Sequence, residues 1–279
     1  MILALDQVAP NVQAVVLQTG GKGYGLEYPD EVDIRPPLRE DMARIPSPLC
    51  DEVFYYAQYD TLKAMSSSRQ WTFAEVRPDG IVGFLPGASS PMNMAQGIAL
   101  YLVVWRAVYG EGSEVPYPGS QKAYATKHSD TFQDTLSQME IFVALNDKVR
   151  DDGAVFNVAT GDEPITWAEK WPGVCAKLGL IGVAPRSDGQ QQTMQEFVLS
   201  HRSAWEDVCD KYGLRKDSID VQGWGHTQFM LADFDFDRQY DVSKACAAGF
   251  TESIDATIAY GITFERMAGT HIIPVQFLK

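Results

Sequence analysis

Near-continuous apolar runs alternate with helical patterns along most of the chain. Three runs read as buried strands, because parallel strands covered on both faces are apolar along their length; they are VQAVVLQ (12–18), WTFAEVRP (71–78) and GAVFNVAT (153–160). Helices are predicted between and after them, at 52–68, 93–110, 130–147 and 165–180. This alternation predicts a parallel sheet with covering helices.

Capping residues and prolines set the expected boundaries. Asp51 is the expected N-cap of the helix at 52–68, and Asn93 or Ser90 that of the helix closed by Gly110. Pro10 ends a short helix at 1–9, proline-rich 26–50 predicts a loop, and 79–87 also reads as a loop.

The pattern changes near residue 186, where a polar, flexible stretch (186–193) precedes a helical pattern at 194–214 and short irregular pieces. We therefore expect two parts, a truncated Rossmann-like domain at 1–185 and a smaller C-terminal substrate lobe at 186–279. Folds of this α/β class begin with a Gly-rich βα turn, whereas this sequence begins within a helix. The chain thus reads as the second part of a larger Rossmann-like fold.

Charge and composition exclude several classes of partner. The formal net charge of −14 repels phosphate backbones and anionic lipid, so nucleic acid and membrane are not expected partners. The longest apolar run, IALYLVVW (98–105), is too short to span a bilayer, and no signal peptide is recognised. Four widely spaced cysteines without a C-x-x-C motif predict free thiols and a cytoplasmic location.

The stretch LQTGGKGYG (17–25) resembles a nucleotide loop only at first sight. Its glycines fit neither G-x-G-x-x-G nor G-x-x-x-x-G-K-[ST]. The four histidines show no metal-ligand spacing, and no G-x-S-x-G is present, so neither a metal site nor a serine hydrolase is predicted. Lys22 and Tyr24 are left at the end of a predicted strand.

Six segments occur together in the order typical of one family: LQTGGKGYG (17–25), FYYAQYD (54–60), VRPDGIVGFLPG (76–87), PMNMAQGIALY (91–101), VFNVATGDEPITWAEKWP (155–172) and DVSKACAAGF (241–250). The chain resembles the progesterone 5β-reductase and iridoid synthase-like (PRISE-like) short-chain dehydrogenases/reductases, with the fungal members nearest. The resemblance implies a Rossmann fold that binds NADPH and reduces the C=C bond of an enone or enal by 1,4-addition of hydride.

The resemblance also implies a catalytic pair. Lys22 is the lysine of T-G-x-K-x-Y and Tyr55 the first tyrosine of F-Y-Y, and both would face the ligand's carbonyl oxygen. This sequence departs from the family at Val53, where the group has asparagine, and at Tyr59-Asp60, where it has E-D. The family's first strands and Gly-rich turn precede the position of Met1, so this chain alone should lose tight NADPH binding.

The chemistry expected of the pair is stabilisation of an enolate oxygen by a phenol donor. A neighbouring ammonium favours ionised tyrosine, so Lys22 should ease proton loss from Tyr55. The alternative is that Tyr55 packs in the core and Lys22 is solvated. A rival Y-x-x-x-K pair, Tyr59 and Lys63, shares one helix face one turn later.

Further residues would line a pocket for cofactor and substrate. Tyr24 and Tyr56 would support the pair, while Pro78, Ile81, Gly83 and Phe84 would form a wall. Met92 and Asn93 begin the apolar helix, where methionine suits an irregular apolar pocket. The alternatives are loop and helix aromatics, a strand-ending turn, and core packing.

Three functional hypotheses follow. The first is an NADPH-dependent enone or enal reductase of secondary metabolism, acting on a small apolar carbonyl-containing ligand. The second is a non-redox cyclase, isomerase or cycloaddition catalyst without cofactor, in which the same pair polarises a carbonyl. The third is a non-catalytic relative; a sheet edge left open by absent strands would also favour a homodimer.

Overall fold

The computed structural model describes residues 4–86, 90–186 and 192–279. The chain forms two compact units, each assembled from three stretches. Unit 1 comprises Met1–Asp79, Ser129–Pro164 and Arg238–Ser253, and unit 2 comprises Gly80–His128, Ile165–Asp237 and Ile254–Lys279. Neither unit coincides with 1–185 or 186–279, and that assignment of domains stays a prediction. The start of the helix expected at 1–9, residue 87 of the expected loop and most of the polar stretch (187–191) lie outside the described residues.

The centre of unit 1 is the parallel sheet that the apolar runs predict. Its strands are β1 (Ala14–Gln18), β2 (Thr72–Pro78) and β6 (Ala154–Val158), in the order β1-β2-β6. Val16 pairs with Ala74 across the first interface, and Val76 with Phe156 across the second. The α/β class is thereby confirmed.

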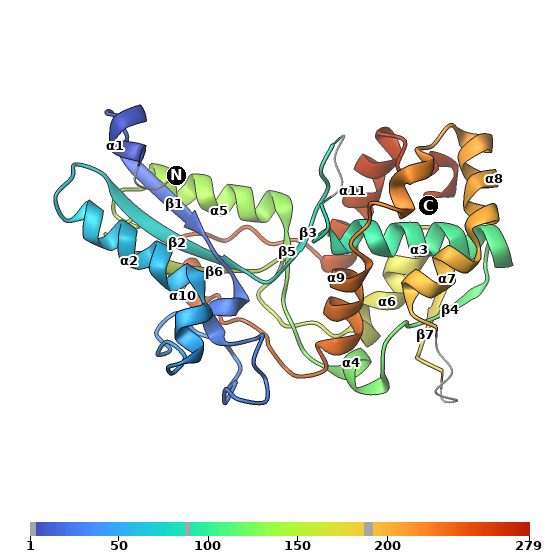
Figure 1. Cartoon of the computed structure of the whole chain (residues 1–279), viewed down its shortest axis with the longest axis horizontal. Helices are drawn as coiled ribbons and strands as arrows, with labels where there is room; N and C mark the ends of the chain where they lie inside the picture. Colours follow the sequence, from blue (N-terminus) through green and yellow to red (C-terminus); the bar gives the residue numbers. More distant parts are fainter. Residues whose placement is uncertain (1–3, 87–89, 187–191) are drawn as a thin grey trace. The chain divides into compact units, whose positions relative to one another are not determined.

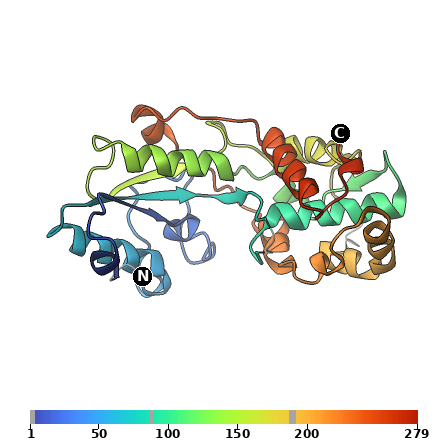
Figure 2. The same cartoon turned by 90° about the horizontal axis from the view of Figure 1, so that it is seen from above.

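Helices α2 (Phe54–Ser66) and α5 (Gln133–Leu145) cover opposite faces of this sheet (Figures 1 and 2). On the α2 face, Leu62 of the helix packs with Trp71 and Phe73. Side chains alternate along a strand, so Glu75 and Arg77 share this face with Phe73. A glutamate and an arginine therefore lie inside the layer between helix and sheet.

The remaining elements of unit 1 are short: α1 (Leu5–Val8), η2 (Gly21–Tyr24), η3 (Leu49–Glu52), β5 (Asp130–Phe132) and α10 (Ser243–Ala247). The predicted N-cap Asp51 is wrong. Asp51 lies within the η3 turn, and the N-cap of α2 is Val53, whose side chain makes no capping bond. The helix predicted at 130–147 begins instead as strand β5.

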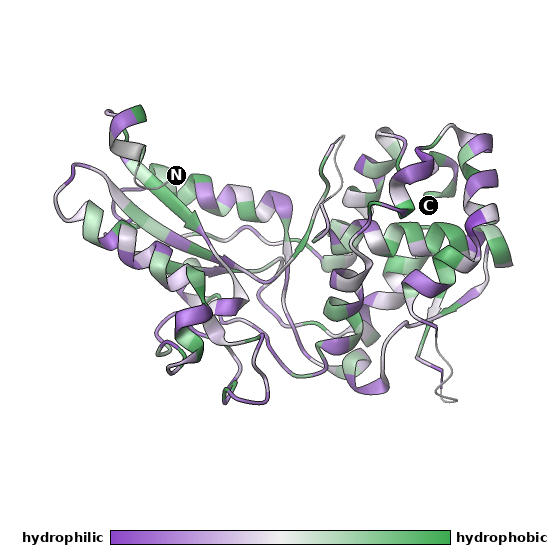
Figure 3. Cartoon of the chain, viewed as in Figure 1, coloured by the Kyte–Doolittle hydropathy of each residue, from purple (hydrophilic) through white to green (hydrophobic). Residues whose placement is uncertain are grey.

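Unit 2 is built around helix α3 (Met94–Tyr109), which packs against α7 (Met194–Ser200), α8 (Arg202–Tyr212), α9 (Trp224–Gln228) and α11 (Ala256–Gly269). Every residue from Met94 to Arg106 is buried, and Figure 3 shows the helix hydrophobic along most of its length. Asn93 caps it by accepting from the Gln96 amide at 3.0 Å, and Gly110 ends it, as predicted.

The other elements of unit 2 are β3 (Gly80–Val82), β4 (Glu114–Pro116), α4 (Gln121–Ala125), α6 (Trp167–Ala176), β7 (Ile181–Val183), η4 (Lys216–Ile219), η5 (Phe229–Asp233) and η6 (Val275–Phe277). Strands β4 and β7 pair in parallel. The loop predicted at 79–87 is wrong over β3, where the chain stays extended after Pro78. Within the described ranges, every helix is too short or too polar to span a bilayer.

Candidate active site

The glycine-rich stretch after β1 is a tight turn that carries Lys22. Gly25 adopts a left-handed conformation (φ 79°), and a Cβ there would lie 2.9 Å from Val32. The Gly23 amide donates to the Gly20 carbonyl at 3.2 Å and the Gly25 amide to the Lys22 carbonyl at 3.0 Å. Because these amides are used within the turn, they are not available to a phosphate.

Lys22 lies at the carboxyl end of β1, as predicted for this class of sheet. Its ammonium forms an ion pair with Glu27 at 2.6 Å and stands 5.9 Å from the centre of the Phe54 ring. The lysine and glutamate side chains are each about one third exposed (34% and 39%). Sequence reasoning missed Glu27, because a spacing of five residues in an irregular turn predicts no contact.

Tyr55 lies on the first turn of α2 and is half-buried. A Cβ added to Gly20, two residues before Lys22, would stand 3.8 Å from the Tyr55 hydroxyl, so that hydroxyl is close to the turn. Burial raises the pKa of Tyr55; the Lys22 charge lowers it less strongly, and Glu27 adds to the rise. Lys22 thus acts in the expected direction and eases proton loss, but burial outweighs its effect on the pKa of Tyr55. Tyr55 is a neutral hydrogen-bond donor at ordinary pH.

Tyr56 and Tyr24, which lie close to Tyr55 and Lys22 in the chain, are buried, and both hydroxyls are hydrogen-bonded. The Tyr56 hydroxyl donates to the Gly23 carbonyl at 2.8 Å and accepts from the Ile45 amide at 3.1 Å. The Tyr24 hydroxyl donates to Asn157 Oδ1 on β6 at 2.6 Å. Both tyrosines thus bind the turn to the body of unit 1.

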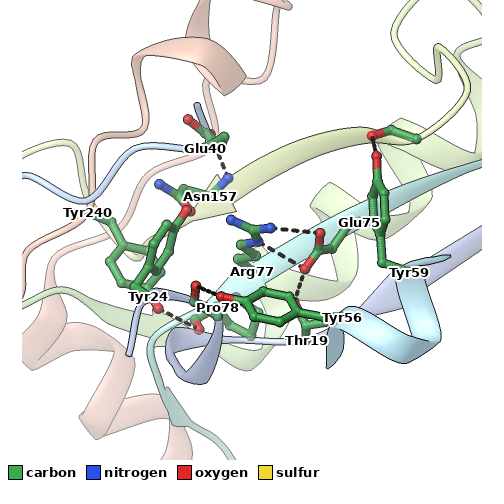
Figure 4. A network of polar contacts seen from close by, with 12 residues as sticks. Thr19, Tyr24, Glu40, Tyr56, Tyr59, Glu75, Arg77, Pro78, Asn157 and Tyr240 are labelled. Carbon is green, nitrogen blue, oxygen red and sulfur yellow. Dashed lines mark hydrogen bonds and ion pairs between the residues drawn. The ribbon is translucent and has the colours of Figure 1, made fainter. Parts of the chain in front are cut away.

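A polar network not foreseen from the sequence lies beside the turn (Figure 4). Glu75 accepts from the Thr19 hydroxyl at 2.5 Å and from Arg77 at 2.9 and 3.0 Å. The Arg77 guanidinium stands 5.0 Å from the centre of the Tyr24 ring. The signal in the sequence is the pair of charged residues two apart within an otherwise apolar strand, which places both charges on one covered face.

The rival Y-x-x-x-K pair is engaged at the other end of the sheet. The Tyr59 hydroxyl donates to the Gly153 carbonyl at 2.8 Å, and Lys63 binds the Asp152 carboxylate at 2.8 Å. Residues 152 and 153 precede β6 and therefore mark the amino edge of the sheet, opposite the edge that carries Lys22. The structure gives Tyr59 and Lys63 a packing role.

The other predicted pocket residues divide between the two units. Pro78 ends β2 in unit 1, and its carbonyl accepts from the Tyr240 hydroxyl at 3.2 Å. The other five belong to unit 2: Ile81, Gly83, Phe84, Met92 and Asn93. Of these, Met92 is exposed and Asn93 caps helix α3. Their place in a shared pocket stays a prediction.

The Tyr55 hydroxyl and the Lys22 ammonium of unit 1 can together stabilise an anionic oxygen. A neutral phenol and an ammonium lie near one another at the carboxyl edge of a parallel sheet, where ligands of open α/β sheets bind. Such donors stabilise negative charge that grows on a carbonyl oxygen. Glu27 balances the Lys22 charge.

A family model described as a PRISE-like Rossmann-fold domain matches residues 1–274. The short chain dehydrogenase ausT of Aspergillus calidoustus is 33% identical over 274 residues, which cover 97% of this chain and 66% of that protein. The short chain dehydrogenase sirQ of Leptosphaeria maculans is 30% identical, over 99% of this chain and 70% of that protein. The chain thus spans about two thirds of the length of these relatives.

More distant matches agree on the fold. The 3-oxo-Delta(4,5)-steroid 5-beta-reductase of Arabidopsis thaliana is 26% identical, over 83% of this chain and 57% of that protein. Among solved structures, RMD from Pseudomonas aeruginosa complexed with NADPH superposes with a TM-score of 0.53 at 14% identity, over 98% of this chain and 69% of that one. A UDP-galactose 4-epimerase gives 0.54 at 12% identity, over 96% and 66%. Identities this low establish the fold alone.

Proposed function

Because the chain belongs to the PRISE-like Rossmann-fold family and is a short-chain dehydrogenase/reductase-like enzyme, we propose that it reduces the C=C bond of an enone or enal with NADPH. The ligand is a small apolar carbonyl compound of secondary metabolism. Tyr55 and Lys22 hold its carbonyl oxygen. The observation that carries the proposal is a tyrosine kept neutral by burial, beside a lysine, at the carboxyl edge of the sheet.

NADPH, when bound, supplies the hydride for the β-carbon. The C=C electrons then move toward the carbonyl, and negative charge collects on its oxygen as an enolate. The Tyr55 hydroxyl donates a hydrogen bond to that oxygen, and the Lys22 ammonium adds a positive charge nearby. A proton from solvent water then adds to the α-carbon, the enolate returns to the carbonyl form, and the C=C bond is saturated. Since the pKa of Tyr55 is raised, the phenol keeps its proton in the ground state and is a donor from the start.

The glycine turn leaves two of its amides unavailable to a dinucleotide's pyrophosphate. Its Gly23 and Gly25 amides are bonded to carbonyls of the turn itself, and the four-residue η2 is too short to present a helix N-terminus. The residues that fit a ligand are those at the carbonyl end, Tyr55 and Lys22.

A second candidate function draws on the same half-buried tyrosine and neighbouring lysine. Polarising a carbonyl for an isomerisation, cyclisation or cycloaddition uses the same phenol and ammonium and needs no hydride. The product then has the mass of the substrate. This candidate predicts turnover that is independent of NADPH.

Turnover of cyclohexenone and citral by the purified chain, followed by loss of NADPH absorbance and by product mass, separates the two candidates. Tyr55→Phe should lower kcat/KM by about 10² to 10³, the usual effect of removing one oxyanion donor. Tyr59→Phe is the matched control, since it removes a hydroxyl from the same helix that donates to the Gly153 carbonyl at the amino edge of the sheet. Equal activity of wild type and Tyr55→Phe would rule out both candidates.

A further inference from the structure

The ion pair between Glu75 and Arg77 is buried beneath the Lys22 turn. Glu75 is 3% exposed, the Arg77 side chain is 12% exposed, and the ion pair spans 2.9 Å between Arg77 Nε and Glu75 Oε1. Burying two charges costs several kcal/mol of desolvation, and apolar residues of similar size often serve stability equally well. The position of this pair therefore calls for a reason other than packing.

The pair contacts the Lys22 turn at both of its ends. Before the turn, the Thr19 hydroxyl donates to Glu75 at 2.5 Å. After it, the ring of Tyr24 lies 5.0 Å from the Arg77 guanidinium. Thr19 precedes Lys22 by three residues and Tyr24 follows it by two. The Glu75–Arg77 ion pair on β2 thus contacts the short segment that carries the Lys22 ammonium on both sides of that lysine.

The far side of the network is anchored in the sheet. Tyr24 donates to Asn157 on β6, and the Asn157 amide donates to the Leu38 carbonyl at 2.8 Å and to the Asp241 carbonyl at 3.0 Å. Figure 4 shows Thr19, Glu75, Arg77, Tyr24 and Asn157 following one another across the face of strands β2 and β6. The contacts form a continuous path from β1 to β6, with Glu75 in contact with both Thr19 and Arg77.

We propose that Glu75 is a positioning residue for Lys22: paired with Arg77, it holds Thr19 and Tyr24 and so fixes the turn that carries the ammonium. The assignment of Lys22 to a ligand's carbonyl rests on the proposed function. The positioning of the turn does not, and it can be measured without a substrate. Glu75 itself need not touch the ligand.

The test measures how fast an amine-acylating reagent labels Lys22, with Lys63 of the same molecule as the internal reference. Lys63 has its own carboxylate partner, Asp152, at the other end of the sheet. Peptide mass spectrometry gives the labelling ratio of the two lysines. In wild type the Glu27 ion pair protects Lys22. Glu75→Gln keeps the size of the side chain and its acceptor oxygen but removes its charge. It should raise the Lys22-to-Lys63 ratio about fivefold, since the hydrogen bonds from Thr19 and Arg77 weaken when their acceptor is neutral.

Thr19→Val removes the other partner of the same hydrogen bond and keeps the shape of the side chain. It serves as the second test if Glu75→Gln does not fold. It too should raise the ratio. Thr263→Val makes the same change in helix α11, where the hydroxyl donates to the Ala259 carbonyl, and should leave the ratio unchanged. An unchanged ratio in a folded Thr19→Val or Glu75→Gln variant overturns the proposal. An equal rise at Lys22 and Lys63 also overturns it, because it would report general loosening.

Catalysis by the same variants separates this proposal from the proposed function. If the ratio rises but Lys22→Met turns over enones as fast as wild type, Glu75 positions the turn and the assignment of Lys22 to the carbonyl is wrong. If the ratio rises and Thr19→Val lowers kcat with little change in KM, both stand. A rescue is expected in Glu75→Asp, which restores the charge and should bring the ratio back toward wild type.

Discussion

The Tyr56 hydroxyl donates a hydrogen bond of 2.8 Å to the Gly23 carbonyl. Tyr56 is the neighbour of Tyr55 in the chain, and Gly23 is the neighbour of Lys22. One hydrogen bond therefore fixes the helix that carries the phenol relative to the turn that carries the ammonium. The bond is buried.

Tyr56→Phe should lower both the stability of the protein and its activity, because it removes the bond that fixes Tyr55 relative to Lys22. It leaves the Gly23 carbonyl and the Ile45 amide without the hydroxyl that pairs both, at a cost of ~1–3 kcal/mol in unfolding free energy. We expect kcat/KM for an enone to fall at least tenfold, since small displacements of reacting groups are costly. Urea unfolding and steady-state kinetics measure the two effects. Tyr59→Phe, which loses one comparable bond to Gly153, should lose stability without that loss of activity.

Glu27 and Lys22 should shift the pKa of Tyr55 in opposite directions. Glu27 raises that pKa and Lys22 lowers it, on top of the larger rise caused by burial. Glu27→Gln should therefore lower the pKa of Tyr55, and Lys22→Met should raise it. NMR titration of isotope-labelled tyrosine, with the resonance assigned by its loss in Tyr55→Phe, follows both. Shifts of the same sign in the two variants would contradict the proximity of the three side chains.

Tyr24 should make the folded protein sensitive to alkali. Burial raises the pKa of Tyr24 from 10.0 to about 12. A raised folded-state pKa means that stability is complete below the unfolded value and is lost as pH rises through the folded value. The loss therefore falls between pH 10 and about 12 and amounts to roughly 2–3 kcal/mol.

The comparison that isolates this effect is wild type against Tyr24→Phe, by urea unfolding at several alkaline pH values. The variant loses the Asn157 bond and should be less stable at neutral pH. Its stability should fall less steeply above pH 10. Parallel curves for the two proteins would show that Tyr24 does not titrate with the predicted shift.

Gly25→Ala should destabilise the turn for two reasons that a control can separate. The left-handed φ of 79° costs an alanine ~1 kcal/mol, and its Cβ would press on Val32 at 2.9 Å. Gly213→Ala has a similar φ of 68° but meets nothing within 4 Å. Thermal or urea unfolding should show a larger loss for Gly25→Ala. Equal losses would mean that the turn yields to the added methyl group.

The sheet and the main helices could be predicted because they depend on local pattern. Continuous apolar runs marked β1, β2 and β6, and Asn93 and Gly110 marked the ends of α3. β3 was missed because three residues give no periodicity, and Asp51 was assigned to a cap because a 3₁₀ turn before α2 leaves no distinct signal. Both errors lie at boundaries, where a single residue decides the structure.

The candidate site was only partly visible for a different reason. Lys22 and Tyr55 came from the family resemblance, but their surroundings depend on contacts between distant segments: Thr19 reaches Glu75 across 56 positions and Tyr24 reaches Asn157 across 133. The direction of the Tyr55 pKa also required the structure, because the sequence shows the neighbouring charge and not the burial that outweighs it.

The most direct test of the central claim is the carbonyl stretching frequency of a bound enone, measured by isotope-edited vibrational spectroscopy. A hydrogen bond from the neutral Tyr55 hydroxyl polarises the C=O bond and lowers its frequency relative to the free ligand. The account predicts a lowered frequency in wild type that returns most of the way to the free value in Tyr55→Phe and part of the way in Lys22→Met. The same lowered frequency in wild type and Tyr55→Phe would contradict it.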